Sequence, residues 1–133
     1  MMRKFIGTLL FATTALALGA CSATPDKPSD AQPGVVYNKP IADVQKAALN
    51  ALASNGFEIT KSGADYVEGS RPHKMGLLVG SGGETAGVWL TAVSATSTSV
   101  KVDTAKSFAG MAGQKSWDTE IIAAMDSNVG PHH

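Results

Sequence analysis

The chain has little of three things that often reveal a function: cysteine, net charge and long apolar runs. It contains a single cysteine among 133 residues, which excludes an internal disulfide framework and a multi-thiolate metal site. Its eleven basic residues balance eleven acidic ones. Without a basic stripe to release counterions, we expect no nucleic-acid partner. The length limits the fold to one small domain.

The N-terminal segment has the pattern of an export signal. Arg3 and Lys4 precede an uncharged run from Phe5 to Leu18, and small residues follow that run. The run is shorter than the roughly 20 apolar residues that a membrane-crossing helix needs. The pattern therefore predicts a signal peptide over residues 1–20, which is removed from the mature chain.

The residues that close this segment carry a resemblance to a known class of proteins. Leu18, Gly19, Ala20 and Cys21 resemble the lipobox of bacterial lipoproteins. The resemblance implies that the Cys21 thiol receives a diacylglycerol and that the signal peptidase cuts before it. The alternative is an ordinary secretory peptide cut after residues 15–17, which would leave Cys21 as a free thiol, an uncommon state in secreted proteins.

Lipidation of Cys21 would make the membrane a partner of the chain. Two or three acyl chains, at about 0.8 kcal/mol per buried CH₂, anchor a protein stably. Ser22 follows the cysteine. In the lipoproteins that this segment resembles, serine there is compatible with export to the outer membrane. We therefore expect a lipid-anchored protein that faces the periplasm, at the outer membrane in preference to the inner one.

Residues 21–34 have the composition of a tether. After the cysteine they contain three prolines among small and charged residues, and no large apolar side chain. Such a segment cannot bury enough surface to offset the entropy of ordering it, so we predict a disordered tether with a reach of roughly 40 Å. Without residues 1–20 the chain has nine basic and eleven acidic residues. We therefore expect no attraction of the domain to anionic lipid.

The remaining residues, 35–133, show the periodicities of a single α+β domain. Apolar residues recur at helical spacing over 41–54, and again over 117–128 after a predicted N-cap at Ser116. Between the helices, alternation predicts strands over about 57–60, 66–68, 84–94 and 100–105. The order α-β-β-β-β-α predicts an antiparallel four-stranded sheet with both helices on one face.

The combination of lipobox, tether and small α+β domain is similar to that of small bacterial envelope lipoproteins. The element order is distantly similar to that of the helix-grip domains in the lipoprotein C subunit of the outer-membrane β-barrel assembly machine. Fold alone does not fix function.

The sequence contains no complete catalytic or cofactor motif. The glycine-rich segment 76–84 lacks the Lys-Ser/Thr pair of a phosphate loop, and Thr85 stands where a dinucleotide fingerprint needs glycine. No G-x-S-x-G or S-x-x-K motif occurs. His73 is isolated, and His132 and His133 are adjacent without acidic neighbours. We therefore expect no cofactor and no metal site.

One candidate site is a small positive cluster. Arg71, His73 and Lys74 precede the glycine-rich segment and offer contacts for an anion such as a phosphate, a carboxylate or an acidic cell-wall peptide. The simpler interpretation of this cluster is a solvated loop.

The other candidate is an apolar surface on the third strand. If Val88 and Leu90 face the helices, alternation turns Trp89 to the opposite face. Leu77 and Leu78 lie in an apolar loop nearby. Either this loop folds back over the sheet, or the apolar side chains remain as a surface for a partner.

These observations lead to two hypotheses on function. The first is a lipid-anchored, non-catalytic accessory or scaffolding protein of the envelope, which acts through contacts with another envelope protein. The alternative is a ligand-binding or hydrolytic module that acts on cell-wall or glycan material through residues 71–83.

Overall fold

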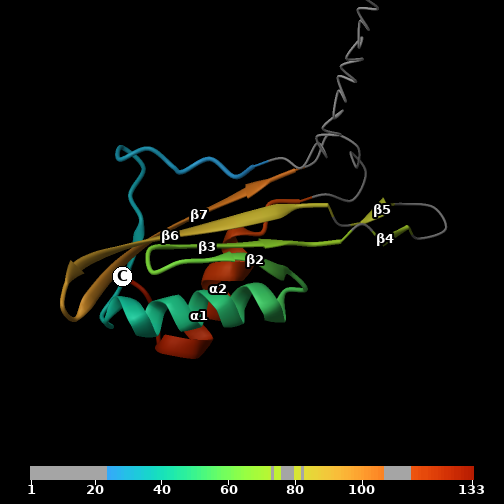
Figure 1. Cartoon of the computed structure of the whole chain (residues 1–133). Helices are drawn as coiled ribbons and strands as arrows, with labels where there is room; N and C mark the ends of the chain where they lie inside the picture. Colours follow the sequence, from blue (N-terminus) through green and yellow to red (C-terminus); the bar gives the residue numbers. More distant parts are fainter. Residues whose placement is uncertain (1–23, 73, 76–79, 82, 107–114) are drawn as a thin grey trace, which may run out of the picture.

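The chain folds into an α+β domain with two helices and a five-stranded antiparallel sheet (Figure 1). The computed structural model describes residues 24–72, 74–75, 80–81, 83–106 and 115–133. The elements of these ranges are β1 (Val35–Tyr37), α1 (Ile41–Ser54), β2 (Glu58–Ser62), β3 (Tyr66–Ser70), β4 (Lys74–Met75), β5 (Gly80–Ser81), β6 (Thr85–Ser94), β7 (Ser97–Ala105) and α2 (Asp118–Val129).

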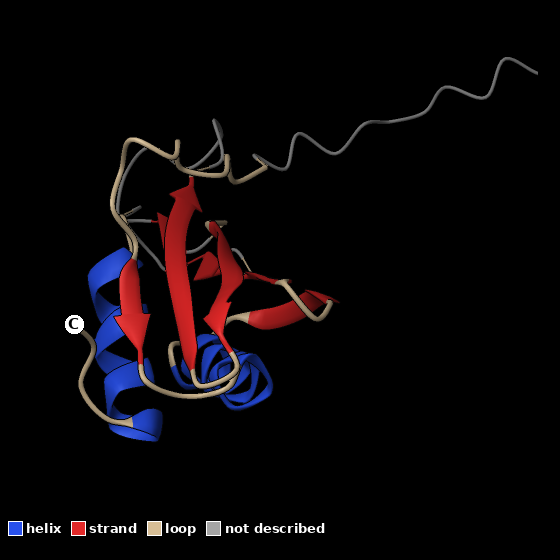
Figure 2. Cartoon of the chain, turned by 90° about the vertical axis from the view of Figure 1, so that its left-hand side faces the viewer, coloured by secondary structure: helices blue, strands red, loops and turns tan. Residues whose placement is uncertain are grey.

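The five-stranded sheet has the order β1-β7-β6-β3-β2, and each neighbouring pair is antiparallel. Both helices lie on one side of this sheet in Figure 1, and Figure 2 gives the perpendicular view with α1 seen nearly end-on. The predicted α+β class with two helices and an antiparallel sheet is therefore confirmed. Neither helix in the described ranges has the length and apolar character to span a bilayer.

The prediction of four strands and of a helix as the first element is wrong. A fifth strand, β1, precedes α1 and pairs with β7 through Val35 opposite Val100 and Tyr37 opposite Thr98. Three residues are too few to show a period of two, and their partners lie more than sixty positions away. The structure also contains a small antiparallel hairpin of β4 and β5, which was not predicted.

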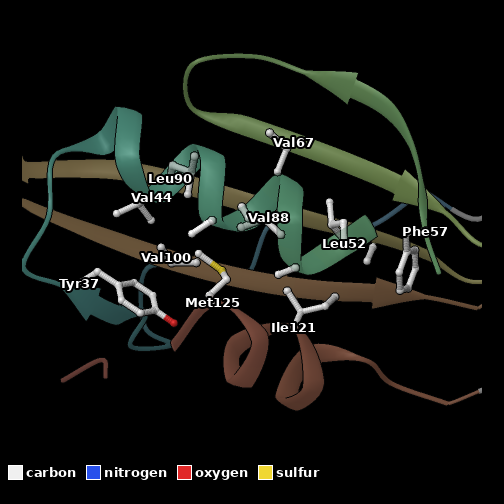
Figure 3. Close-up of a cluster of buried hydrophobic side chains, with 14 residues drawn as sticks. Tyr37, Val44, Leu52, Phe57, Val67, Val88, Leu90, Val100, Ile121 and Met125 are labelled. Carbon is white, nitrogen blue, oxygen red and sulfur yellow. The ribbon is translucent and has the colours of Figure 1, made fainter. Parts of the chain in front are cut away.

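The core lies between the helices and the inner face of the sheet, which is the face that the helices cover (Figure 3). Helix α1 has the predicted bounds and buries Val44, Leu52 and three alanines against the strands. The alanines let its backbone lie close to the sheet. Ile121 and Met125 of α2 complete the core, as the predicted apolar stripe requires.

The edge strand β2 differs from the prediction of a half-buried strand. Phe57 is buried just before the strand, but all five residues of β2 are exposed, and Ile59 keeps 40% of its surface accessible. The pairing with β3 shifts register between Ile59 and Lys61. This irregularity and the edge position remove Ile59 from the core.

The long hairpin of β6 and β7 confirms the predicted alternation. Val88 and Leu90 are buried on the inner face, and Trp89 between them lies on the opposite, outer face. Strand β7 starts at Ser97, three residues before the predicted start, because a two-residue turn joins the strands and Ser94 pairs with Ser97.

Helix α2 begins at Asp118, and the predicted N-cap at Ser116 is wrong. The start of the helix is instead held by Thr104 of β7. The Thr104 hydroxyl accepts a hydrogen bond from the Trp117 N–H at 3.0 Å and donates one to Asp118 Oδ1 at 2.6 Å. A side chain of a distant strand therefore caps the start of α2, in place of the local cap that the sequence predicted.

Candidate functional site

The outer face of the sheet, on the side away from the helices, holds an aromatic pair. Tyr66 of β3 stands opposite Trp89 of β6, and their ring centroids are 4.9 Å apart with a 38° tilt. Gly87, two residues before Trp89, leaves room for both rings, since an added Cβ would lie 2.8 Å from the Tyr66 hydroxyl oxygen. Both aromatic residues are half-buried. The outer face therefore presents a partly accessible aromatic surface, which we call the Tyr66–Trp89 pair.

Carboxylates flank this pair. Gly87 of β6 pairs with Glu68 of β3 on one side and with Asp103 of β7 on the other. The Cα atoms of Glu68 and Asp103 are therefore two strand spacings apart, about 10 Å. The Tyr66 hydroxyl donates a hydrogen bond to Glu68 Oε2 at 2.5 Å, and the Thr60 hydroxyl donates one to Oε1 at 3.2 Å. These bonds fix the mostly buried Glu68 carboxylate beside the phenol ring.

The acidic surroundings change the acidity of the phenol. Burial raises the pKa of Tyr66 above its ordinary value, and the hydrogen bond to Glu68 and the charges of Glu68 and Asp103 raise it further. An ionised phenolate would face two carboxylates. Tyr66 therefore remains a neutral hydrogen-bond donor over the whole physiological pH range.

Residues 24–34, which we call the strap, lie along the same outer face. They belong to the predicted tether, and Figure 1 shows them running above β7, on the side opposite α1. The Asp26 N–H donates a hydrogen bond to Asp103 Oδ2 at 2.9 Å. Lys101 Nζ donates one to the Ser29 carbonyl oxygen at 2.9 Å and lies 3.7 Å from the Asp30 carboxylate.

A recess of about 150 Å³ remains between the strap and the sheet. Its walls include Trp89 and Thr91 of β6, Lys101 of β7, and Lys27 and Asp30 of the strap. The sequence placed Trp89 on this face. Leu77 and Leu78, of the loop considered as a cover for this face, lie outside the described residues, whereas the strap residues Lys27 and Asp30 lie beside Trp89.

Arg71, one residue of the predicted positive cluster, contacts groups on the inner side of the sheet. Arg71 follows β3 directly, and alternation from the buried Val67 places it on the inner face. Its Nη1 atom lies 3.5 Å from Oε2 of the fully buried Glu84. Its guanidinium also stacks on the Trp117 ring, 4.3 Å from the centroid. Arg71 is thus engaged inside the protein. His73 lies outside the described residues, and only the backbone of Lys74, in β4, is described.

This Arg71–Trp117 cluster closes one end of the core. Phe57 contacts the Trp117 ring edge-to-face at 5.8 Å, and Lys115 Nζ lies 4.1 Å from its centroid. Two buried polar atoms, Glu84 Oε1 and Trp117 Nε1, have no hydrogen-bond partner among the described residues. Arg71 and Glu84 are not among the residues that line the three cavities described for this part of the chain.

A larger groove of about 530 Å³ lies between α2, the β1–β7 edge and the strap. Val35, Val102 and Ile122 make its walls largely apolar, and Pro33 of the strap closes one side. Gly34 brings the strap close to β7, since an added Cβ would lie 2.8 Å from the Val100 carbonyl oxygen. The strap is therefore a wall of both the groove and the recess over Trp89.

Asp126 organises the rim of this groove. It accepts a hydrogen bond from the Tyr37 hydroxyl at 2.8 Å, and His132 Nδ1 lies 2.8 Å from the same oxygen. Burial by itself raises the pKa of Asp126, but the bonds with His132 and Tyr37 outweigh it and hold the pKa below its ordinary value. The interaction ties residues near His132 to α2. His133 extends the same attachment by exchanging two backbone hydrogen bonds with Val36 of β1.

Sequence reasoning missed most of the groups around the aromatic pair. Trp89 was identified by alternation, but Tyr66, Glu68 and Asp103 were not, although the same alternation along their strands could have placed them on the outer face. Leu18, Gly19, Ala20 and Cys21, the predicted lipidation residues, lie outside the described residues. Within the described ranges, no three side chains of the metal-ligating types come together.

Comparison of the chain with models of protein families and with curated proteins finds no significant match.

Proposed function

We propose that the protein is a lipid-anchored, non-catalytic accessory or scaffolding component of the bacterial envelope. Cys21 carries the lipid, and the folded domain faces the periplasm, at the outer membrane in preference to the inner one. The domain contacts an envelope protein through the outer face of its sheet.

The observation that carries the proposed contact is the Tyr66–Trp89 pair. The helices cover the other face, so burying these rings is not needed to close the core. Trp89 nevertheless stands where a polar side chain would suffice, and its ring packs against that of Tyr66 at 4.9 Å between centroids. Large, rigid aromatic side chains are the residues that most often dominate protein interfaces.

The Arg71–Glu84 contact supports a binding role over the alternative, a module that acts on cell-wall or glycan material. Arg71 is one of the three cationic residues, with His73 and Lys74, that an anion-binding or hydrolytic site at residues 71–83 was expected to use. Arg71 instead contacts Glu84 at 3.5 Å and stacks on Trp117, which uses its charge inside the fold.

The anchor is tested by Cys21→Ser. We expect this variant to lose incorporation of labelled fatty acid and to remain uncleaved or leave the membrane fraction, because the thiol that receives the lipid is gone. Ser22→Ala is the matched control and should be labelled like the wild type. Undiminished labelling of Cys21→Ser would refute the lipobox interpretation.

The contact surface is tested separately by Trp89→Ala, with Val93→Ala as control. Val93 lies in the same strand, β6, at a register shift beside the turn, and is 63% exposed, without an aromatic neighbour in the described contacts. We expect Trp89→Ala to stay folded and to lose the envelope protein that the intact lipoprotein retains after detergent solubilisation, whereas Val93→Ala keeps it. Equal retention by the two variants would exclude Trp89 from the interface. A fall of the melting temperature by many degrees would place Trp89 in a second core.

A further inference from the structure

The outer face of the sheet holds a segment of this chain, and the contacts show what kind of segment it accepts. The strap contributes three groups to this contact: a backbone N–H, a backbone carbonyl and a carboxylate. The N–H of Asp26 meets the Asp103 carboxylate, and the Asp30 carboxylate meets Lys101.

The strap reaches the recess at Trp89 with its charged residues. Lys27 and Asp30 line that recess together with Trp89 and Lys101, whereas Pro28 and Pro33 line the groove beside α2. The Gln32 N–H donates a hydrogen bond to the Ser29 carbonyl oxygen at 3.0 Å, so a turn presents Asp30 toward Lys101. Asp103 and Lys101 are therefore the groups of the sheet that hold the strap on the outer face.

The strap is positioned to be displaced. Its described hydrogen bonds to the sheet are exposed to solvent, and the Asp30 carboxylate is fully exposed. Exposed ion pairs and hydrogen bonds contribute little and exchange readily with water. Lys101, by contrast, keeps only 16% of its side-chain surface accessible. Release of the strap would thus uncover Lys101 and open the recess at Trp89.

We propose that the outer face is a recognition surface for a peptide segment that offers a backbone N–H to Asp103 and a carboxylate to Lys101, and that residues 24–34 occupy it in cis. An envelope partner with such a segment binds by displacing the strap. This inference rests on the proposed function, because it identifies how the partner of that same surface is recognised.

Displacement also changes the distance from the membrane. With the strap docked, only the residues between Cys21 and Thr24 separate the lipid from the domain, a span of about 10 Å. With the strap released, the free segment extends to β1 and reaches roughly 40 Å. Partner binding and extension from the membrane are therefore coupled through the same eleven residues.

The docked strap is tested first, by the exchange rate of the Asp26 amide in the full chain in detergent micelles. A hydrogen-bonded amide is protected, so we expect exchange at least about tenfold slower than in an unstructured peptide. Lys101→Ala should reduce the protection of this amide, because it removes the contacts with Ser29 and Asp30. Lys46→Ala, an exposed lysine on α1, should leave it unchanged. Unprotected exchange in the wild type would overturn the proposal.

Competition is tested with a synthetic peptide of residues 24–34 and the variant Asp26→Pro, which lacks the N–H that binds Asp103. In the wild type the tethered strap competes at an effective concentration in the millimolar range. We expect the peptide to bind Asp26→Pro at least about tenfold more tightly than the wild type. Asp26→Asn keeps the N–H and is the matched control, with wild-type affinity expected.

Two further outcomes would contradict the proposal. Equal affinity of the peptide for the wild type and for Asp26→Pro would show that the strap does not occupy the peptide site. Unchanged affinity of a peptide in which Ala replaces Asp30 would show that the recognised chemistry is wrong. Neither readout depends on the lipid or on the envelope partner. If only the proposed function fails, the strap still protects the Asp26 amide and still competes with the peptide, but no envelope protein is retained.

Discussion

Replacement of Trp117 should change the free energy of unfolding by an amount that follows from the contacts of its ring. The half-buried ring contacts Phe57 edge-to-face and carries Arg71 on its π-system. Loss of a buried tryptophan costs about 3–5 kcal/mol, including the cavity that remains. Because part of this ring is exposed, we expect Trp117→Ala to lower the free energy of unfolding by about 3 kcal/mol, the lower end of that range.

Trp117→Phe separates the ring from its polar atom. The indole Nε1 is buried and has no described partner, and an unsatisfied buried donor costs about 1–3 kcal/mol. Phenylalanine removes this donor and keeps an aromatic face for Arg71 and Phe57. The two effects oppose each other, so we expect Trp117→Phe to change the free energy of unfolding by less than about 1 kcal/mol.

Urea unfolding followed by circular dichroism measures both variants against the wild type, with Val93→Ala as an exposed control. A loss below about 1 kcal/mol for Trp117→Ala, the range of surface substitutions, would refute a role of this ring in the core. A loss for Trp117→Phe as large as that for Trp117→Ala would show that the indole N–H makes a contact that the structure does not describe.

Two further predictions concern charge and acidity. Arg71→Ala leaves the buried Glu84 carboxylate without its cation and should lower the free energy of unfolding in urea by about 3 kcal/mol. The double variant Arg71→Ala/Glu84→Gln should recover part of this free energy, because the uncompensated charge is removed. If the double variant recovers nothing, Arg71 acts by stacking alone. The chain has two tyrosines, and burial together with carboxylate neighbours raises the pKa of both Tyr37 and Tyr66. Their stabilising contribution is complete below the unfolded pKa of about 10 and is lost as the pH rises above it. Ultraviolet titration should therefore show no tyrosine ionisation in the native chain at pH 10, and half-ionised tyrosine there would contradict the described hydrogen bonds.

The spacing of apolar residues along the chain correctly predicted helix α1 and the two faces of strand β6. Helix α1 has the predicted bounds because its apolar residues repeat at helical spacing and a proline and a glycine lie near its ends. The inner and outer faces of β6 follow directly from alternation, which is why Trp89 was placed correctly on the outer face. These features need no knowledge of the partner strands.

Features that depend on distant residues could not be predicted in the same way. Strand β1 forms by pairing with β7, more than sixty positions away in the sequence. The start of α2 depends on the hydroxyl of Thr104, which also belongs to β7. The composition of residues 21–34 predicts disorder, but it does not show that Asp103 and Lys101 offer contacts to the strap. Arg71 was considered as an anion contact because its partner Glu84 lies thirteen positions away, across the glycine-rich segment.

Site-specific photo-crosslinking in the native envelope identifies which face of the domain meets the envelope partner. A photoreactive residue replaces Thr91, which is exposed on the outer face beside Trp89, or Ala53, which is exposed on α1. A lipid-anchored protein that binds its partner through the outer face should give a discrete crosslinked protein adduct from position 91 and none from position 53. Adducts from position 53 alone, or equal yields from both positions, would show that the outer face of the sheet is not the partner-binding surface.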